Sequence, residues 1–384
     1  MREIVLKMTL WITIGIIVLL SFMIGMGIYM FKKEINKEDP DYIFQFIKEN
    51  AKSERVALSI NYNKQKWVKV NQNKQLPLAS TVKIIIAMEY ARQAAEGKID
   101  PLQEVSLEEL NSFYIPKTDG GAHEAWIANL NDGKETDKVH LSEVAKGMIA
   151  YSSNANTEYL IHVLGLENIN TSLESLGISN HEPLYPIVSA LFIPTQLMKE
   201  QNITKQEMLE VMKSMDISEY RKRAMDIHNK WLNYPPAAEE KKQIVKTLDM
   251  DVQRIWSNRL PRSTSEDYVY IMEKLNNKTY FDEDTYKYLD PVMEQLMENP
   301  NNRKWLVHAG QKGGSTAFII TTAMYATDKD GNQTELAFFA NDLTSFEQTK
   351  LSRNLNGFKL KFLKDAEFRA LIQKELSALE SRIP

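Results

Sequence analysis

The sequence contains no cysteine. This absence excludes disulfide bonds, a thiol nucleophile, a lipid-modified cysteine and zinc sites built from thiolates. The six histidines show no metal-ligand spacing such as His-x-x-x-His; they lie at positions 123, 140, 162, 181, 228 and 308. We therefore expect no metal centre and no cofactor.

The chain also lacks an excess of charge of either sign, since 47 Lys and Arg stand against 51 Asp and Glu. Acidic and basic residues are mixed along the chain, so there is no basic patch of the kind that binds nucleic acid. We expect no nucleic-acid partner. A length of 384 residues fits one fairly large globular domain, or one that carries an inserted subdomain, and no short-period repeat is present.

One long apolar run is present, because residues 8–31 contain no charged side chain. This run is long enough to span a bilayer, and Trp11 and Tyr29 lie near its two ends, as interfacial aromatics do. A cleaved signal peptide has a shorter apolar core and an Ala-x-Ala-like site. The sequence therefore favours an uncleaved, single-pass membrane anchor.

The charges on the two sides of the run do not fix its orientation. Arg2 and Lys7 precede it, while Lys32, Lys33 and Lys37 follow it. We expect a short flank over 1–7, the anchor over 8–31, a linker over 32–40 and one domain over 41–384. The domain is expected outside the cytoplasm because of the function argued below.

The segment from Leu76 to Tyr90 predicts a buried helix with Ser80 in its first turn. Ile84, Ile85 and Ile86 leave little polar surface on the next turn. Residues three apart share a helix face, so Ser80 Oγ and the Lys83 ammonium are expected to meet. A lysine among apolar side chains can lose its proton near neutral pH and then deprotonate a serine. Alternatively, Ser80 only caps the helix.

Strands are predicted at both ends of the domain, with helices between them. The expected strands cover 56–62, 66–70, two segments within 305–325 and 335–340; the expected helices cover 41–51, 141–150 and 366–380. The fold class is therefore α+β, in which terminal segments pair into one antiparallel sheet that packs on a helical subdomain.

Three short motifs follow one another along this layout: Ser80-Thr-Val-Lys83, Ser152-Ser-Asn154 and Lys312-Gly-Gly314. Their order resembles the signature of class A serine β-lactamases and penicillin-binding proteins, namely Ser-x-x-Lys, Ser-Asp-Asn and Lys-Thr-Gly. The resemblance covers roughly residues 41–376. It implies a β-lactamase/transpeptidase-like fold behind one transmembrane helix.

The resemblance also implies a role for each matching residue. Ser80 would be the acylated nucleophile and Lys83 its general base. Ser152 would relay a proton to the leaving group, and Asn154 would hold a substrate amide. Lys312 would supply positive charge, and the backbone amides of Ser80 and Ser315 would form the oxyanion hole, with Gly314 and Thr316 beside the substrate. The implied substrate is a small-molecule or peptidoglycan-derived acyl compound, such as a β-lactam or a D-alanyl peptide.

The motifs depart from the family pattern at three points. Ser153 stands where the family has aspartate, and Gly313 stands where it has a hydroxyl residue that helps to bind the substrate carboxylate. Ser315 or Thr316 could substitute for that hydroxyl. The loop glutamate that activates the deacylating water is followed in the family by Leu-Asn, which does not follow Glu182 here. Slow or altered deacylation is therefore expected.

A helical insertion is predicted at about 195–260, with amphipathic helices over 198–217 and 239–256. It either packs beside the site or forms a lid that restricts which substrates enter. Two other functions stay open for the chain. The first is an esterase or amidase for a different acyl substrate, and the second is a penicillin-binding or sensing module without turnover.

Overall fold

The computed structural model describes residues 33, 37–130 and 136–380. In this part of the chain, every helix is too short or too polar to cross a bilayer. The anchor predicted over 8–31 lies outside the described residues.

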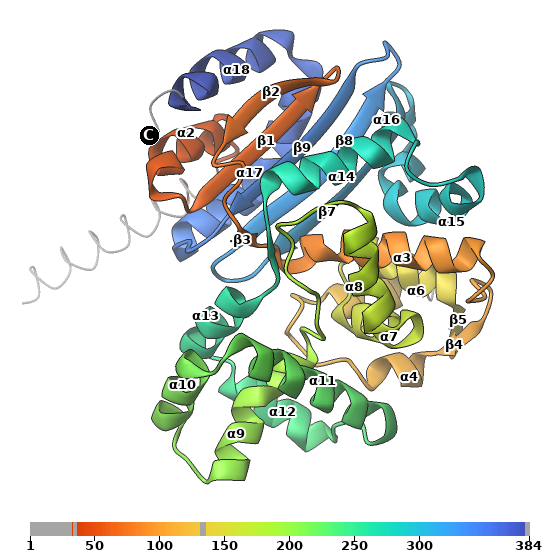
Figure 1. The fold of residues 1–384 in the computed structure, drawn as a ribbon, viewed down its shortest axis with the longest axis vertical. Helices are drawn as coiled ribbons and strands as arrows, with labels where there is room; N and C mark the ends of the chain where they lie inside the picture. Colours follow the sequence, from red (N-terminus) through yellow and green to blue (C-terminus); the bar gives the residue numbers. More distant parts are fainter. Residues whose placement is uncertain (1–32, 34–36, 131–135, 381–384) are drawn as a thin grey trace, which may run out of the picture.

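A five-stranded antiparallel sheet with the strand order β2-β1-β9-β8-β7 forms one half of the molecule (Figure 1). Both chain ends supply its strands, as predicted: β1 (Val56–Tyr62), β2 (Gln65–Val70), β7 (Leu306–Ser315), β8 (Ile320–Asp328) and β9 (Gln333–Ala340). Two further two-stranded sheets pair β3 (Leu76–Pro77) with β6 (Arg262–Ser263) and β4 (Glu104–Ser106) with β5 (Lys138–His140).

Apolar side chains alternate along the strands, so each face of the sheet has its own core. On one face Leu58, Leu336 and Phe338 pack with three helices, α2 (Asp41–Asn50), α17 (Ser345–Lys364) and α18 (Ala366–Glu380). On the other face Ala57 and Phe339 belong to the core of the helical half. The helices nearest this face are α14 (Ser265–Asn277) and α15 (Glu283–Met293), followed by the short α16 (Pro300–Arg303).

The helical half is built around α3 (Lys83–Ala95), in which Ile84, Ile85 and Ile86 are buried. Its other helices are α4 (Leu107–Asn111), α5 (Ala122–Leu130), α6 (Leu141–Ala150), α7 (Asn154–Leu164) and α8 (Leu166–Ser175). The prediction that the helix already begins before Lys83 is wrong. Leu76 and Pro77 form strand β3, and Ser80 lies on a 3₁₀ turn, η2 (Ala79–Val82), before α3 begins.

The predicted helical insertion contains five helices, which lie together at the lower end of the molecule in Figure 1. They are α9 (Ile193–Gln201), α10 (Lys205–Ser214), α11 (Ile217–Asn233), α12 (Ala238–Thr247) and α13 (Met250–Arg259). The two long helices predicted from periodicity are broken at Asn202, which adopts a left-handed conformation, and at Leu248–Asp249, where α13 takes Asp249 as its N-cap. Left-handed and capping residues end helices even where the apolar pattern continues.

A buried carboxylate ties the insertion to the helical half. Glu158 of α7 accepts hydrogen bonds from the Val188 and Ser189 amides at 2.6 and 3.3 Å and from Ser189 Oγ at 3.0 Å. It also lies 2.8 Å from His228 Nδ1 on α11. Both side chains are buried. Glu158 therefore fixes the 186–192 segment and α11 at once.

Candidate active site

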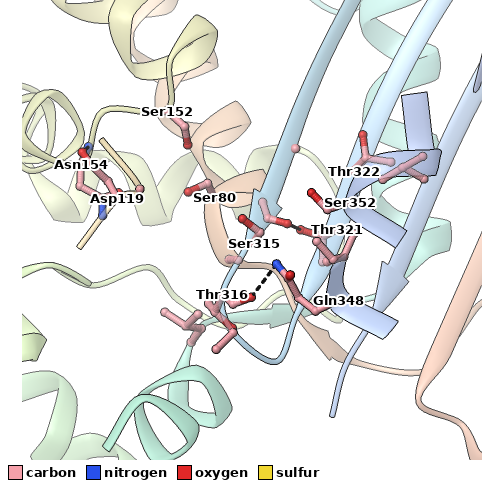
Figure 2. Close-up of a pocket in the computed structure, with 18 of the residues that line it drawn as sticks. Ser80, Asp119, Ser152, Asn154, Ser315, Thr316, Thr321, Thr322, Gln348 and Ser352 are labelled. Carbon is pink, nitrogen blue, oxygen red and sulfur yellow. Dashed lines mark hydrogen bonds between the residues drawn. The ribbon is translucent and has the colours of Figure 1, made fainter. Parts of the chain in front are cut away.

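The three sequence motifs meet at one cavity of about 760 Å³ (Figure 2). Most of the predicted site residues line it, namely Ser80, Ser152, Asn154, Gly314, Ser315 and Thr316. Lys83 and Lys312 are buried and are not among the lining residues. The structure thus brings the motif residues together although they are up to 236 positions apart (316 minus 80).

Two residues at the site have a left-handed backbone that L-residues rarely adopt. Ala79 has φ 45° and Ser152 has φ 70°. Such conformations cost free energy and cluster at functional sites, where the surrounding structure enforces them. Here they lie at the sharp turn before Ser80 and at the turn that presents Ser152 before α7.

Among the described residues, Lys83 donates hydrogen bonds only to neutral oxygens. Its Nζ donates to the Ser152 carbonyl at 2.7 Å and to Asn154 Oδ1 at 2.9 Å, with longer contacts to Ser152 Oγ at 3.3 Å and the Ser153 carbonyl at 3.4 Å. Burial, and then the nearby charge of Lys312, hold the pKa of Lys83 well below its usual value. The hydrogen bond expected between Lys83 Nζ and Ser80 Oγ is absent from the described residues, where the amine points to Ser152 and Asn154 instead.

Lys312 lies on the edge strand β7, and its Nζ donates to the Gly313 carbonyl at 2.9 Å. Burial lowers its pKa to about 7. Two buried lysines whose charges repel each other are both easier to deprotonate than free lysine. The site therefore holds a lysine whose pKa is lowered by burial, beside the Ser152 hydroxyl, which is an arrangement that can accept a serine proton.

Gly314 lies directly against the Ser80 backbone. A Cβ on Gly314 would stand 2.5 Å from the Ser80 amide nitrogen and 2.7 Å from the Leu78 carbonyl oxygen. A Cβ on the neighbouring Gly313 would meet only the Thr321 carbonyl oxygen, at 3.6 Å. Gly313 has space beside it, whereas Gly314 permits a close approach of the β7 backbone to the Ser80 backbone.

Ser153, which replaces the family's aspartate, is fully buried. Its Oγ accepts from the Asn156 amide at 3.3 Å as the N-cap of α7 and lies 2.9 Å from His123 Nδ1. The residue supports the turn that carries Ser152 and Asn154.

Carboxylates are scarce in the cavity. Glu182 does not line it and instead pairs with Arg221 on α11 at 2.9 Å. Asp119 is the one carboxylate among the described lining residues. Its oxygens accept from the amides of Gly121, Ala122 and His123, each at 3.2 Å, at the start of α5. The sequence analysis missed Asp119, although an aspartate before a Gly-Gly turn is a typical helix-start signal.

Helix α13 of the insertion forms one wall of the cavity through Met250, Gln253 and Trp256. Ser257 Oγ donates to Thr316 Oγ1 at 2.9 Å, and Trp256 Nε1 donates to the Ile187 carbonyl at 3.1 Å. Gln348 of α17 donates to the Thr316 carbonyl at 3.3 Å (Figure 2). Thr316 therefore joins the insertion, the β7–β8 turn and α17.

Comparison with protein families places the chain in a known group. The model of the β-lactamase enzyme family matches residues 41–310, and the chain belongs to this family. The match includes the first two motifs and ends just before the third. A comparison with curated protein sequences found no match.

Solved structures show the same fold at low sequence identity. A β-lactamase from Chitinophaga pinensis DSM 2588 is 13% identical, with a TM-score of 0.50, over 82% of this chain and 98% of that one. A β-lactamase from Sphaerobacter thermophilus DSM 20745 is 15% identical, with a TM-score of 0.50, over 83% and 97%. The chromosome-encoded β-lactamase of Vibrio parahaemolyticus is 9% identical, with a TM-score of 0.50, over 85% and 100%.

Proposed function

We propose that this protein is a serine acyl hydrolase that attacks β-lactam or D-alanyl-type amides through an acyl-enzyme on Ser80. The observation that carries the proposal is the buried Lys83, whose ammonium contacts Ser152 and Asn154 at the cavity that Ser80 lines. In this proposal neutral Lys83 accepts the Ser80 proton, and it does so through Ser152 Oγ. Ser152 then passes a proton to the leaving amine.

Deacylation is proposed to be slow. A water molecule that hydrolyses the acyl-enzyme needs a base, and the one carboxylate among the described lining residues, Asp119, is already held by four backbone amides. This supports penicillin-binding behaviour over rapid antibiotic destruction.

Intact-protein mass spectrometry of residues 38–384 with penicillin G is the test. We expect a persistent adduct of one penicillin that maps to Ser80 and is lost in Ser80→Ala. A Ser214→Ala variant, which changes an exposed serine of α10 outside the cavity, is the control and should still be labelled. Labelling of Ser80→Ala at the parent rate would refute the nucleophile. Absence of any adduct would move the proposal to an ester substrate.

We also propose that residues 8–31 anchor the protein with its domain outside the cytoplasm, where peptidoglycan-derived substrates occur. The apolar run supports this proposal. The measurement is labelling of intact cells with a membrane-impermeant penicillin. A protein that is labelled only after the cells are lysed would contradict the proposed orientation.

Acylation by a penicillin is expected to fall as the pH rises above about 7. Burial lowers the pKa of Lys312 to about 7, so its positive charge is present below that pH and lost above it. The charge of Lys312 attracts the carboxylate of the penicillin. When Lys312 loses its proton, Lys83 can still act as the base, but the attraction for the substrate is lost. Lys312→Arg keeps the charge and should move the descending limb to higher pH. A neutral ester serves as the control substrate, and the same descending limb with both substrates would contradict the assignment.

A further inference from the structure

The cavity does not end at the nucleophile but continues around the edge of strand β7. Figure 2 shows Ser80 and Ser152 on one side of this strand and Thr322 and Ser352 on the other. The second part, here named the α17 arm, lies between the sheet and α17. It is lined by Gln311, Gly313, Thr322, Ser352, Asn356 and Lys359.

The register of the sheet explains why the arm exists. Side chains alternate along β7, so Lys312 and Gly314 face Ser80 while Gln311 and Gly313 face α17. Gly313 pairs with Thr322 of β8 and has no side chain to fill the space above it. On α17 the polar positions Gln348, Ser352 and Lys359 lie on one helix face with helical spacing. Because Gly313 stands where the third motif of the family has a hydroxyl residue, no side chain fills this part of the cavity.

Lys359 is buried in the arm without a carboxylate partner. Its side chain is 7% exposed, and its Nζ donates at 2.5 Å to a neutral acceptor, Gln311 Oε1. Burial lowers its pKa to about 8. No Asp or Glu is among the described residues that line the arm. A buried ammonium that is left without a negative partner favours an anionic ligand.

A second side chain in the arm also lacks a partner. Thr322 Oγ1 is buried and makes no hydrogen bond within the described structure. Buried hydroxyls are nearly always satisfied, so an orphan that lines a polar cavity indicates a group that a ligand supplies. Ser352 and Asn356 add further hydrogen-bonding groups to the same space.

We propose that the α17 arm is an anion-binding subsite, in which Lys359 and Thr322 hold a carboxylate or phosphate group on the opposite face of β7 from Ser80. This proposal does not depend on acylation of Ser80. The anion could be a free ion, or it could be carried by a larger polar ligand whose other groups meet the hydroxyl and amide side chains of the arm.

The test uses Ser80→Ala protein, so that no turnover interferes, and isothermal titration calorimetry. The probes are inorganic phosphate, N-acetylmuramic acid and N-acetylglucosamine, which lacks the carboxylate of the muramic acid. Binding of phosphate indicates a free-anion site. Binding of N-acetylmuramic acid alone indicates a carboxylate on a saccharide. Failure of both anionic probes, or equal binding of N-acetylglucosamine, overturns the proposal.

Variants then locate the site. Lys359→Met should weaken binding of the anionic probe by about 10-fold or more, because hydrogen bonds to charged groups are the strong ones. Lys361→Met is the matched control, since Lys361 lies two residues away on α17 and pairs with Asp41 at 2.7 Å outside the cavity. Equal losses in the two variants would overturn the assignment to Lys359.

Thr322→Val replaces the orphan hydroxyl by a methyl group of the same shape. Its thermal stability should equal or exceed that of the parent, because no hydrogen bond is lost in the free protein. Its affinity for the anionic probe should fall about threefold or more, the range of one neutral hydrogen bond. Destabilisation with unchanged affinity would show that the hydroxyl has a structural role and would count against the subsite.

Discussion

Gly314→Ala is expected to lower the rate of Ser80 acylation by about 100-fold or more, the loss that follows when one oxyanion donor is displaced. The new Cβ would stand 2.5 Å from the Ser80 amide nitrogen, 2.7 Å from the Leu78 carbonyl oxygen and 2.6 Å from Thr321 Oγ1. Two of these atoms belong to the backbone and cannot rotate away. The Ser80 amide must therefore move, together with the nucleophile that it carries.

Gly313→Ala is the matched control, because its Cβ meets a single atom at 3.6 Å, an ordinary contact distance. Its acylation rate should remain within about twofold of the parent, since the substitution leaves the Ser80 backbone in place. The rates are measured by time-resolved mass spectrometry with penicillin G, and circular dichroism confirms that both variants are folded. Equal rates for the two alanine variants would show that the close approach of Gly314 to Ser80 is unimportant for acylation.

Glu158→Ala is expected to reduce the free energy of unfolding by about 3 kcal/mol or more, because each buried donor that loses its acceptor costs roughly 1–3 kcal/mol. The substitution leaves His228 Nδ1 and the amides of Val188 and Ser189 without their acceptor. It should also loosen the cavity wall, because Ile187 and the insertion are both held through these contacts.

Glu182→Ala is the control for Glu158→Ala. Its carboxylate also contacts a side chain of α11, Arg221, but both side chains are partly exposed, at 32% and 21%. Exposed pairs contribute roughly 0–1 kcal/mol. Urea unfolding measures both variants, and similar losses of stability would refute the structural role given to Glu158. An unchanged rate of deacylation in Glu182→Ala would also show that Glu182 does not activate the deacylating water.

The sheet and the central helix were predictable because their residues repeat with a clear period. Strands β1, β2 and β9 follow alternating or β-branched runs, and the Ile84–Ile86 run correctly placed Lys83 in an apolar environment. Helix α17 was missed, although Thr344 and Glu347 form a capping box before its apolar positions. That omission also hid Lys359 and the α17 arm.

Other features depend on contacts that no local pattern encodes. Glu158 and His228 are 70 positions apart, and each is unremarkable among its sequence neighbours. The hydrogen bond expected between Ser80 and Lys83 is absent from the described residues, although side chains three apart share a face on a 3₁₀ turn; Lys83 Nζ donates instead to Ser152 and Asn154. Short 3₁₀ segments are decided by the packing around them, here by Gly314 and Leu78.

The position of β7 at the edge of the sheet also bears on self-association. An edge strand presents unpaired main-chain groups, which recruit strands of other molecules and promote aggregation. Between Gln311 and Thr316 this edge lies inside the cavity, flanked by Trp256 of α13 and Gln348 of α17. The two helices therefore stand beside the part of this edge that a strand of another molecule would have to approach. Helices that flank a sheet edge in this way are one means by which proteins limit strand pairing between molecules.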